Sequence, residues 1–339
     1  MSTDLQPYLT AIEEELRRIV SAPTESVAPF YNMMAYHLGW LDQQFRPIEA
    51  YSGKRIRPLL CLLACEAAGG DWRWALPAAA ALELVHNFSL IHDDIEDNSP
   101  TRRGRPTVWT VWGLPHGVNV GDGMLALARL AMARLCDCGT DTTIVLKAML
   151  ILDQTCVNLC QGQSLDIAYE GSLDVTEESY LQMIGGKTAA LIAASTQLGA
   201  LVAGVGDKTE HYRQFGWHLG LAFQMVDDIL GIWGDPTTTG KPAADDIRSR
   251  KMTLPIIFAL RAGDQGKELA DLYSKKCLSD EDVSRAVALL ERVGARQYVQ
   301  GLAAQYEATA LAALDAAAAR QPAAEHLRNL AISLTARQK

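Results

Sequence analysis

The 339-residue sequence has little positive charge, few aromatic residues and no apolar leader. Its formal net charge is −9, and its densest basic cluster is only Arg102, Arg103 and Arg105. Without a basic face, a nucleic-acid partner is not expected. The first 18 residues are polar and amphipathic. We therefore expect neither a secretory signal nor export.

The seven cysteines do not form the pattern of a secreted disulfide scaffold. An odd number of cysteines without a secretory signal indicates a reducing compartment, so we expect a cytoplasmic protein. Three pairs have close spacings, namely Cys61/Cys65, Cys136/Cys138 and Cys156/Cys160. No further Cys or His stands at a spacing that would complete a metal site. We expect these thiols to lie in the core.

Strand-type alternation is scarce, and no Pro- or Ser-rich linker or internal repeat divides the chain. Helical periodicity predicts helices near residues 4–20, 28–46, 56–69, 74–97, 117–137, 142–168, 176–204, 208–233, 253–262, 279–293, 296–319 and 322–337. The apolar stretch 188–205 is about long enough for a bilayer. Its Ala and Gly residues favour a tightly packed core helix, so no membrane span is expected. The sequence predicts one all-α domain over residues 1–339.

Two acidic motifs interrupt apolar runs. Asp93-Asp94-Ile95-Glu96-Asp97 follows Phe88 to Ile91, and Asp227-Asp228 follows Phe223 to Val226. Either motif alone could be a solvated face, but charge on a buried stretch must be compensated. Asp93 and Asp97 lie one helical turn apart, where a shared cation would keep both ionised. Hard oxygen ligands indicate Mg²⁺, which keeps several waters and bridges to substrate phosphates.

Cationic residues accompany both acidic motifs. Lys54 and Arg57 precede a helix that Pro58 would start, and a helix start attracts anions. The other cations are Arg102 and Arg103, Lys187 after Gly185-Gly186, and Lys241 and Lys251. The joint pattern suits one metal-bridged diphosphate and a second diphosphate held directly by cations. A nucleotide-binding P-loop is excluded at Lys187, because Leu181 stands where its first glycine is needed.

These motifs together resemble the trans-isoprenyl diphosphate synthases. The matching segments are Gly53-Lys54-Arg55-Ile56-Arg57-Pro58, residues 86–97, Arg102-Arg103-Gly104, Gly186-Lys187-Thr188, residues 223–228 and the segment from Gly234 to Lys241. They run in family order from about residue 50 to 255. The resemblance implies an isoprenoid synthase-type helical bundle around a central apolar cavity. It also implies a homodimer and two acidic motifs that face each other at the mouth of the cavity.

The resemblance further implies an Mg²⁺-dependent, head-to-tail condensation of isopentenyl diphosphate with a dimethylallyl, geranyl or farnesyl diphosphate. Asp93, Asp97 and Asp227 would hold Mg²⁺, with three ions per site. The residues that would hold the allylic diphosphate are Arg102, Lys187, Thr188, Gln224, Lys241 and Lys251. Those that would hold isopentenyl diphosphate are Lys54, Arg57, His86 and Arg103. The catalytic set would be Asp93, Asp97, Arg102, Lys187, Asp227 and Lys241.

Two positions depart from the common pattern of the family. Gly231 stands where many members have the last aspartate of the second motif, so we do not expect a metal ligand there. Trp109 stands where many relatives have histidine, and we interpret it as a packing aromatic. A class I terpene cyclase is an alternative, but residues 227–235 lack its usual Asn/Asp–Ser/Thr–Glu metal motif. A non-catalytic regulatory subunit is a second alternative, and it would be expected to lose carboxylates or cations that this chain keeps.

Chain length in this family depends on the cavity floor below the first acidic motif. Phe88 lies five residues before Asp93, beside the small Ser89. One bulky ring at this place resembles synthases of geranylgeranyl diphosphate, a C20 product. Farnesyl diphosphate, a C15 product, and longer chains are the alternatives. Core packing is the alternative role for Phe88.

Overall fold

The computed structural model describes residues 5–50, 53–235 and 244–336. The chain divides into two compact units, and each unit is built from several segments of the sequence. Unit 1 comprises Met1–Gln154, Ser195–Thr209 and Arg320–Ala323, and unit 2 comprises Thr155–Ala194, Glu210–Ala319 and Ala324–Lys339. Helices α7 (Thr142–Tyr169) and α9 (Ala190–Val202) contribute residues to both units.

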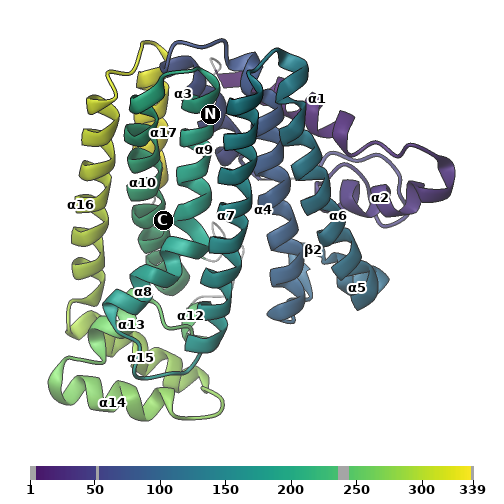
Figure 1. The fold of residues 1–339 in the computed structure, drawn as a ribbon. Coiled ribbons are helices and arrows are strands. Elements are labelled where there is room, and N and C mark those ends of the chain that lie inside the picture. The colour runs from purple at the N-terminus through teal and green to yellow at the C-terminus, as the bar shows by residue number, and fades with distance from the viewer. Residues whose placement is uncertain (1–4, 51–52, 236–243, 337–339) are drawn as a thin grey trace. The chain divides into compact units, whose positions relative to one another are not determined.

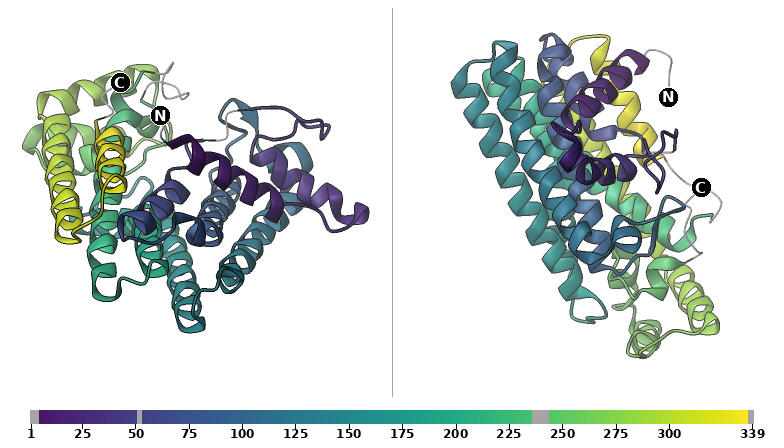
Figure 2. Two further views of the ribbon diagram at one scale, coloured as in Figure 1. Left: turned by 90° about the horizontal axis from the view of Figure 1, so that it is seen from above. Right: turned by 90° about the vertical axis from the view of Figure 1, so that its right-hand side faces the viewer.

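Unit 1 is helical apart from one small hairpin. Its helices are α1 (Gln6–Ile19), α2 (Ala28–His37), α3 (Ile56–Ala67), α4 (Leu76–Glu96), α5 (Val108–Trp112) and α6 (Leu114–Ala133). Short 3₁₀ turns span Glu25–Val27, Trp72–Ala75, Arg134–Cys138 and Gly206–Lys208. Helices α4 and α6 run side by side (Figures 1 and 2). Most of α4 is buried, because residues 76–82 are all apolar and the buried Glu83 and Asn87 that follow have hydrogen-bond partners.

The described part of the chain has strands only between α4 and α5. Strands β1 (Thr101–Arg102) and β2 (Arg105–Pro106) pair antiparallel, with Arg102 opposite Arg105. The two residues of the connecting turn, Arg103 and Gly104, have φ of 53° and 73°. Positive φ at both central residues is the pattern of a type I′ hairpin turn. The predicted all-α fold therefore carries one short hairpin directly after the first acidic motif.

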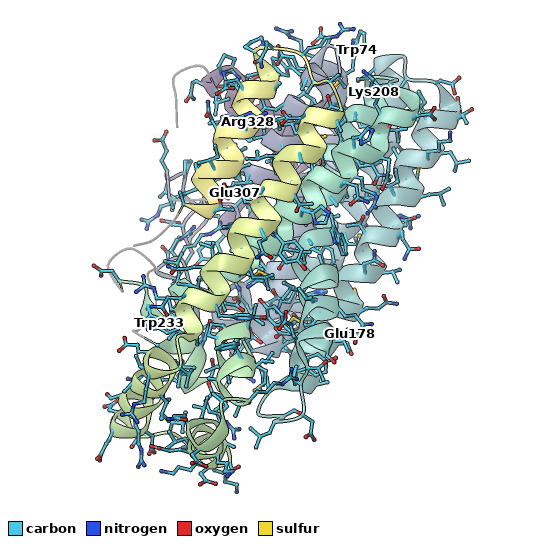
Figure 3. The ribbon with its side chains drawn as sticks, turned by 90° about the vertical axis from the view of Figure 1, so that its left-hand side faces the viewer. Trp74, Glu178, Lys208, Trp233, Glu307 and Arg328 are labelled. Carbon is cyan, nitrogen blue, oxygen red and sulfur yellow. The ribbon has the colours of Figure 1, made fainter. Side chains whose placement is uncertain are left out.

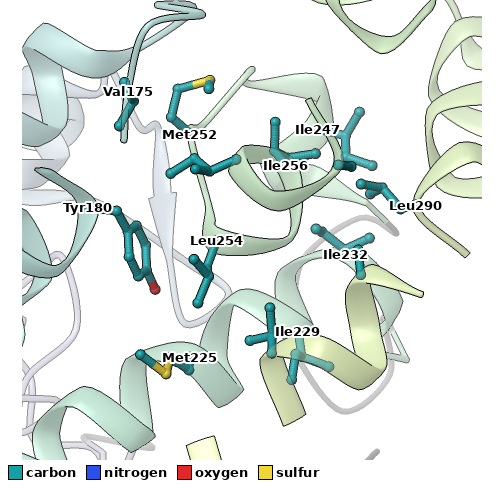
Figure 4. Close-up of a cluster of buried hydrophobic side chains, with 14 of the residues drawn as sticks. Val175, Tyr180, Met225, Ile229, Ile232, Ile247, Met252, Leu254, Ile256 and Leu290 are labelled. Atoms are coloured by element: carbon teal, nitrogen blue, oxygen red, sulfur yellow. The ribbon is translucent and has the colours of Figure 1, made fainter. Parts of the chain in front are cut away.

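Unit 2 consists of helices that surround an apolar core. They are α8 (Glu177–Ile184), a π-helical turn (Gly185–Ala189), α10 (Thr209–Trp233), α12 (Asp245–Arg248), α13 (Leu254–Ala259), α14 (Gly263–Tyr273), α15 (Asp280–Arg292), α16 (Ala295–Ala316) and α17 (Ala323–Thr335). Figure 4 shows Tyr180, Met225 and Leu254 within this core. Figure 3 shows α16 and α17 side by side, and the ion pair between Asp315 and Arg328 joins them.

Several sequence predictions differ from the structure. The helix predicted over 28–46 ends at His37, because Leu38 to Trp40 form a Schellman motif. In this motif the Gly39 and Trp40 N–H groups donate to the Tyr36 and Ala35 carbonyls at 3.0 and 2.9 Å, and Gly39 has φ of 84°. Helix α14, which begins at Gly263, was not predicted from the sequence. The core prediction for cysteines is right for Cys61 and Cys65, but it is wrong for Cys136, Cys138 and Cys160, which are exposed.

Among the described residues, two helices have the length and composition to cross a membrane. In residues Trp72–Glu96 the apolar window is 78% buried, which is typical of a core helix. In Thr142–Tyr169 only 28% of the window is buried. Length and composition alone are weak grounds for a span, because core helices pass the same test.

Candidate active site

The first acidic motif occupies the C-terminal end of α4, and its three aspartates differ in exposure. Asp93 is half-buried and Asp97, the C-cap, is exposed, whereas Asp94 is only 2% exposed. Asp94 accepts a hydrogen bond from Arg102 Nε at 2.8 Å. Burial raises the pKa of Asp94 to about 6, and the Arg102 guanidinium acts in the opposite direction. Asp94 therefore positions Arg102, and the more exposed Asp93 and Asp97 remain the candidates for metal binding.

The position of this motif favours a bound cation. The last carbonyls of a helix carry partial negative charge, so carboxylates at this end are electrostatically unfavourable. Asp93 and Asp97 lie one turn apart there, and the Asp97 N–H donates to the Asp93 carbonyl at 2.8 Å. A divalent cation between the two carboxylates would relieve both the helix-end and the mutual repulsion.

The hairpin after α4 presents two arginines beside the acidic motif. Arg102 is held by Asp94, and Arg103 occupies the first central position of the turn, which usually favours Asn, Asp or Gly. A residue with a long side chain at positive φ costs free energy, and such strain is common at binding sites. A Cβ on Gly53 would lie 2.9 Å from Arg103 Nη2. The structure thus brings the segment that carries Lys54 close to the hairpin.

The three cations of the segment from Lys54 to Arg57 have different surroundings. Lys54 is exposed, whereas Arg55 turns inward at φ 49° and forms an ion pair with Glu83 at 2.7 Å. Arg57 is half-buried, and its buried Nε has no hydrogen-bond partner among the described residues. Burial lowers the pKa of Arg57 to about 10, and Arg103 adds to this effect while Glu83 opposes it. A guanidinium with an unused donor beside another cation is suited to an anionic ligand.

Two histidines lie near these cations. Burial lowers the pKa of His86 on α4 well below its usual value, and Arg57, Arg103 and Arg102 lower it further. His37, at the end of α2, has a similarly lowered pKa, caused by burial and then by Arg102 and Arg103. Both rings are therefore neutral at pH 7. The sequence did not single out His37, because it lies outside every motif.

A narrow pocket in unit 1 joins several of these groups. The residues that line it are Tyr36, His37, Asp94, Arg102, Arg103, Arg105, Pro106, Thr107 and Val108. Trp109, beside the pocket wall, donates from Nε1 to the Ser99 carbonyl at 3.0 Å. The half-buried ring and this bond agree with the interpretation of Trp109 as a packing residue. Phe88 and Ser89 are buried on the same helix as the acidic motif.

In unit 2, Lys187 stands on the π-helical turn between α8 and α9. Its Nζ donates to Asp166 Oδ2 on α7 at 2.5 Å. The turn lies against α7 so closely that a Cβ on Gly162 would be 2.1 Å from the Lys187 nitrogen, and one on Gly186 would be 2.6 Å from the Asn158 oxygen. Single π-helical turns are frequent at functional sites. The sequence predicted a kink at Gly185-Gly186 but missed Asp166, since no motif marks it.

The second acidic motif lies on α10 and repeats the pattern of the first. Asp227 is exposed, whereas Asp228 is 4% exposed and accepts hydrogen bonds from Tyr180 Oη at 2.7 Å and Gln224 Nε2 at 3.0 Å. Burial raises the pKa of Asp228 to about 7, while the Gln224 and Tyr180 bonds act in the opposite direction. Thr188 Oγ1 in turn donates to Gln224 Oε1 at 2.7 Å. Asp228 thus orders the neighbouring side chains, and Asp227 remains the candidate ligand.

The space beside Gly231, which has no side chain, is filled by another residue. A Cβ on Gly231 would lie 1.9 Å from Asp246 Oδ2, so the Asp246 carboxylate occupies the space beside this helix position. Asp246 comes from α12, and its carbonyl accepts a bond from the Lys251 N–H at 2.9 Å. No motif in the sequence singled out Asp246, although the adjacent acids Asp245-Asp246 were a visible signal. Lys241 lies outside the described residues.

These donors fit a metal that is completed by its substrate. Within residues 5–50, 53–235 and 244–336, no group of three or more His, Cys, Asp or Glu side chains is arranged to hold a metal ion. A pair of carboxylates such as Asp93 and Asp97 is nevertheless suited to Mg²⁺, which binds through one or two carboxylates, waters and substrate phosphates.

Comparison with known proteins now identifies the family. The sequence profile described as "Polyprenyl synthetase" matches residues 39–290. The chain belongs to the polyprenyl synthetase family. A geranylgeranyl diphosphate synthase of Mycobacterium tuberculosis is 44% identical over 289 residues, which cover 84% of this chain and 81% of that protein. A (2E,6E)-farnesyl diphosphate synthase of Mycobacterium bovis is 43% identical over 280 residues, covering 81% of this chain and 77% of that protein.

Solved structures agree with this assignment. The crystal structure of a polyprenyl synthetase from Streptomyces coelicolor has a TM-score of 0.88 and 36% identity, covering 97% of this chain and 98% of that one. The predicted isoprenoid synthase-type all-α fold and the predicted family are confirmed. The chain is a prenyltransferase of the polyprenyl synthetase family.

Proposed function

We propose that this prenyltransferase condenses isopentenyl diphosphate head to tail with an allylic diphosphate and requires Mg²⁺. The observation that carries the proposal is the cluster of Arg57, Arg102 and Arg103 beside the aspartates at the end of α4. A metal-binding carboxylate pair next to a cationic pocket suits two diphosphates, one held through metal and one held directly.

The roles follow from this division. Asp93, Asp97 and Asp227 would hold three Mg²⁺ ions together with the allylic diphosphate, and Asp246 would add a nearby carboxylate. The residues proposed to hold the allylic diphosphate are Arg102, Lys187, Thr188, Gln224, Lys241 and Lys251. Those proposed for isopentenyl diphosphate are Lys54, Arg57, His86 and Arg103. When bound, the metal supplies stabilisation of the negative charge that develops on the leaving diphosphate.

The residues of this chain would act by orientation and charge stabilisation. As the allylic C–O bond breaks, Arg102 and Lys187 donate to the oxygens of the departing diphosphate. The double bond of isopentenyl diphosphate, which Arg57 and Arg103 hold in place, attacks the allylic cation before water can. Loss of a proton to the released diphosphate then restores a double bond. No protein nucleophile is required.

The proposed principal product is geranylgeranyl diphosphate. The name of the 44% identical mycobacterial relative supports this choice, and the name of the 43% identical one supports a C15 alternative. Phe88 lies five residues before Asp93 on α4, and its ring meets the His92 ring edge-on at a centroid distance of 5.8 Å. A ring fixed in this way is suited to stop a growing chain.

Phe88→Ala should lengthen the products. Removal of the ring opens space below the acidic motif, so elongation would continue past C20 by one or more isopentenyl units. Mass spectrometry of dephosphorylated products from the two enzymes would measure this. A matched substitution of a buried ring on another helix, Phe215→Ala on α10, should leave the product lengths unchanged. An unchanged C20 product in Phe88→Ala would remove Phe88 from the floor.

One incubation tests the proposed reaction. The purified protein is mixed with isopentenyl diphosphate, Mg²⁺ and dimethylallyl, geranyl or farnesyl diphosphate in turn, and the products are identified by mass. Elongated diphosphates that disappear when EDTA is added support the proposal. Cyclic hydrocarbons would indicate a terpene cyclase instead, and no turnover with any primer would indicate a regulatory subunit.

We also propose that the two compact units form one catalytic domain and that the protein is a cytoplasmic homodimer. Leu146, Leu150 and Val157 are exposed on α7 at spacings of four and seven residues, which place them on one face of the helix. A row of exposed apolar side chains of this kind is typical of a subunit interface. All seven cysteines are free thiols, which supports a reducing compartment.

A further inference from the structure

Arg105 is the one member of the basic cluster Arg102, Arg103 and Arg105 that the proposed reaction does not use. It lies on β2, directly after the turn, and it lines the same narrow pocket as Asp94, Arg102 and Arg103. Its Nη1 donates to the Tyr36 carbonyl at 3.0 Å, and its Nη2 donates to the Leu41 carbonyl at 2.6 Å. One guanidinium thus joins the hairpin to the end of α2 and to the loop that follows α2.

Tyr36 completes a reciprocal contact. Its hydroxyl donates to the carbonyl of Pro106, the residue after Arg105, at 2.7 Å. The Arg105 guanidinium also lies over the Tyr36 ring, 4.1 Å from its centroid. Two further aromatic rings pack beside this pair. Trp112 meets Tyr36 edge-on at a centroid distance of 4.9 Å and stacks on Phe45 at a centroid distance of 5.5 Å. We call the Arg105–Tyr36 pair the hairpin brace. Its side chains donate three hydrogen bonds to backbone carbonyls.

The hairpin needs such support. Each of its strands has two residues, and an isolated two-stranded hairpin is at best marginally stable in water. Its turn holds Arg103 at φ 53°, which a residue with a side chain adopts at a cost. Arg102 has its own anchor in Asp94 at 2.8 Å. Arg103 lies in the turn between the two strands, and the brace holds the backbone of this turn from the β2 side.

We propose that Arg105, through the hairpin brace, is a positioning residue for Arg103 in the binding of isopentenyl diphosphate. The inference rests on the proposed function, which places Arg103 at that substrate. In this proposal, residue 105 must be arginine, because the role depends on the two hydrogen bonds that one guanidinium donates. A lysine could keep the positive charge over Tyr36, but it could not donate to two separate carbonyls in a fixed fork.

Arg105→Lys tests the inference by steady-state kinetics. We expect KM for isopentenyl diphosphate to rise roughly 10- to 100-fold, because a small misplacement of a substrate-holding group has effects of this size. KM for the allylic diphosphate should change much less, since Asp94 still holds Arg102. Tyr36→Phe, which removes only the bond to the Pro106 carbonyl, should raise the same KM by a smaller factor.

A double-mutant cycle separates positioning from general destabilisation. In an Arg103→Ala background, Arg105→Lys should change KM for isopentenyl diphosphate by no more than about twofold, because the group it positions is already absent. Arg129→Lys, which alters an exposed pair with Asp153 on the same unit, is the matched control and should leave both KM values unchanged.

The outcomes are distinct. The positioning role of Arg105 would be wrong if Arg105→Lys left KM for isopentenyl diphosphate unchanged. It would also be wrong if the change in KM were equal with and without Arg103, and the proposed function would stand in both cases. A wild-type protein that does not use isopentenyl diphosphate would overturn both. If circular dichroism shows Arg105→Lys to be unfolded, the milder Tyr36→Phe carries the cycle with the same criteria.

Discussion

Asp93→Asn is expected to lower kcat by about 10²- to 10³-fold, the effect of removing one electrostatic contact to a developing charge. The amide keeps the shape of the side chain but removes the charge that would hold Mg²⁺ on the leaving diphosphate. The same substitution should make the folded protein more stable. Because Asp93 lies at the negative end of α4, its neutralisation should raise the free energy of unfolding by about 0.3–1 kcal/mol.

The measurement pairs kcat at saturating substrates with denaturant unfolding, over a series of Mg²⁺ concentrations. Asp264→Asn is the matched control, because Asp264 is an exposed aspartate on α14 that pairs with the likewise exposed Lys267. It should change neither kcat nor the Mg²⁺ concentration needed for half-maximal rate. A kcat for Asp93→Asn within the error of the wild type would remove Asp93 from the metal site.

Glu83→Gln should lower the free energy of unfolding by about 3 kcal/mol, because it removes the buried partner of Arg55 and leaves only the more exposed Glu13 carboxylate, at 3.3 Å, to compensate the charge. The side chains of Arg55 and Glu83 are 6% and 4% exposed, and their atoms meet at 2.7 Å. Arg55 is also the N-cap residue of α3, between Lys54 and Arg57. The variant should therefore disturb the segment that carries both predicted substrate ligands, and KM for isopentenyl diphosphate should rise with the loss of stability.

Glu210→Gln provides the comparison for this variant. Glu210 meets Arg213 at the same 2.7 Å, but its side chain is 54% exposed. A solvated pair of this kind contributes up to about 1 kcal/mol. Urea unfolding of both variants, followed by circular dichroism, would measure the difference. Equal losses in the two variants would mean that burial of the Arg55–Glu83 pair has no special weight.

Local helical signals allowed most of the fold to be predicted from the sequence. Apolar periodicity and breakers placed α4, α7, α10, α15 and α16 within a few residues of their observed ends. The errors occurred where backbone hydrogen bonding departs from the regular helix. The Schellman motif after His37 shortened one helix, and the π-helical turn at Gly185–Ala189 divided another. Helix α14 was missed altogether, and its sequence contains two glycines, which have low helix propensity.

The sequence predicted which residue types form the candidate site. It did not predict which member of each acidic pair is buried and which is exposed. Spacing marked Asp93-Asp94 and Asp227-Asp228 as acidic pairs, yet in each pair one member is buried and bonded to a neighbour. Which member turns inward depends on partners that are distant in sequence, such as Tyr180. The same holds for Arg55, which belongs to a basic motif but is paired with Glu83 across 28 positions.

The shared space of Gly231 and Asp246 couples what these two positions can hold. An aspartate at 231 would require the Asp246 carboxylate to shift, because the new Cβ would lie 1.9 Å from Asp246 Oδ2, and it would add a like charge beside it. A side chain introduced at 231 should therefore be tolerated best when residue 246 is shortened at the same time, so the two positions should be varied together when the enzyme is engineered.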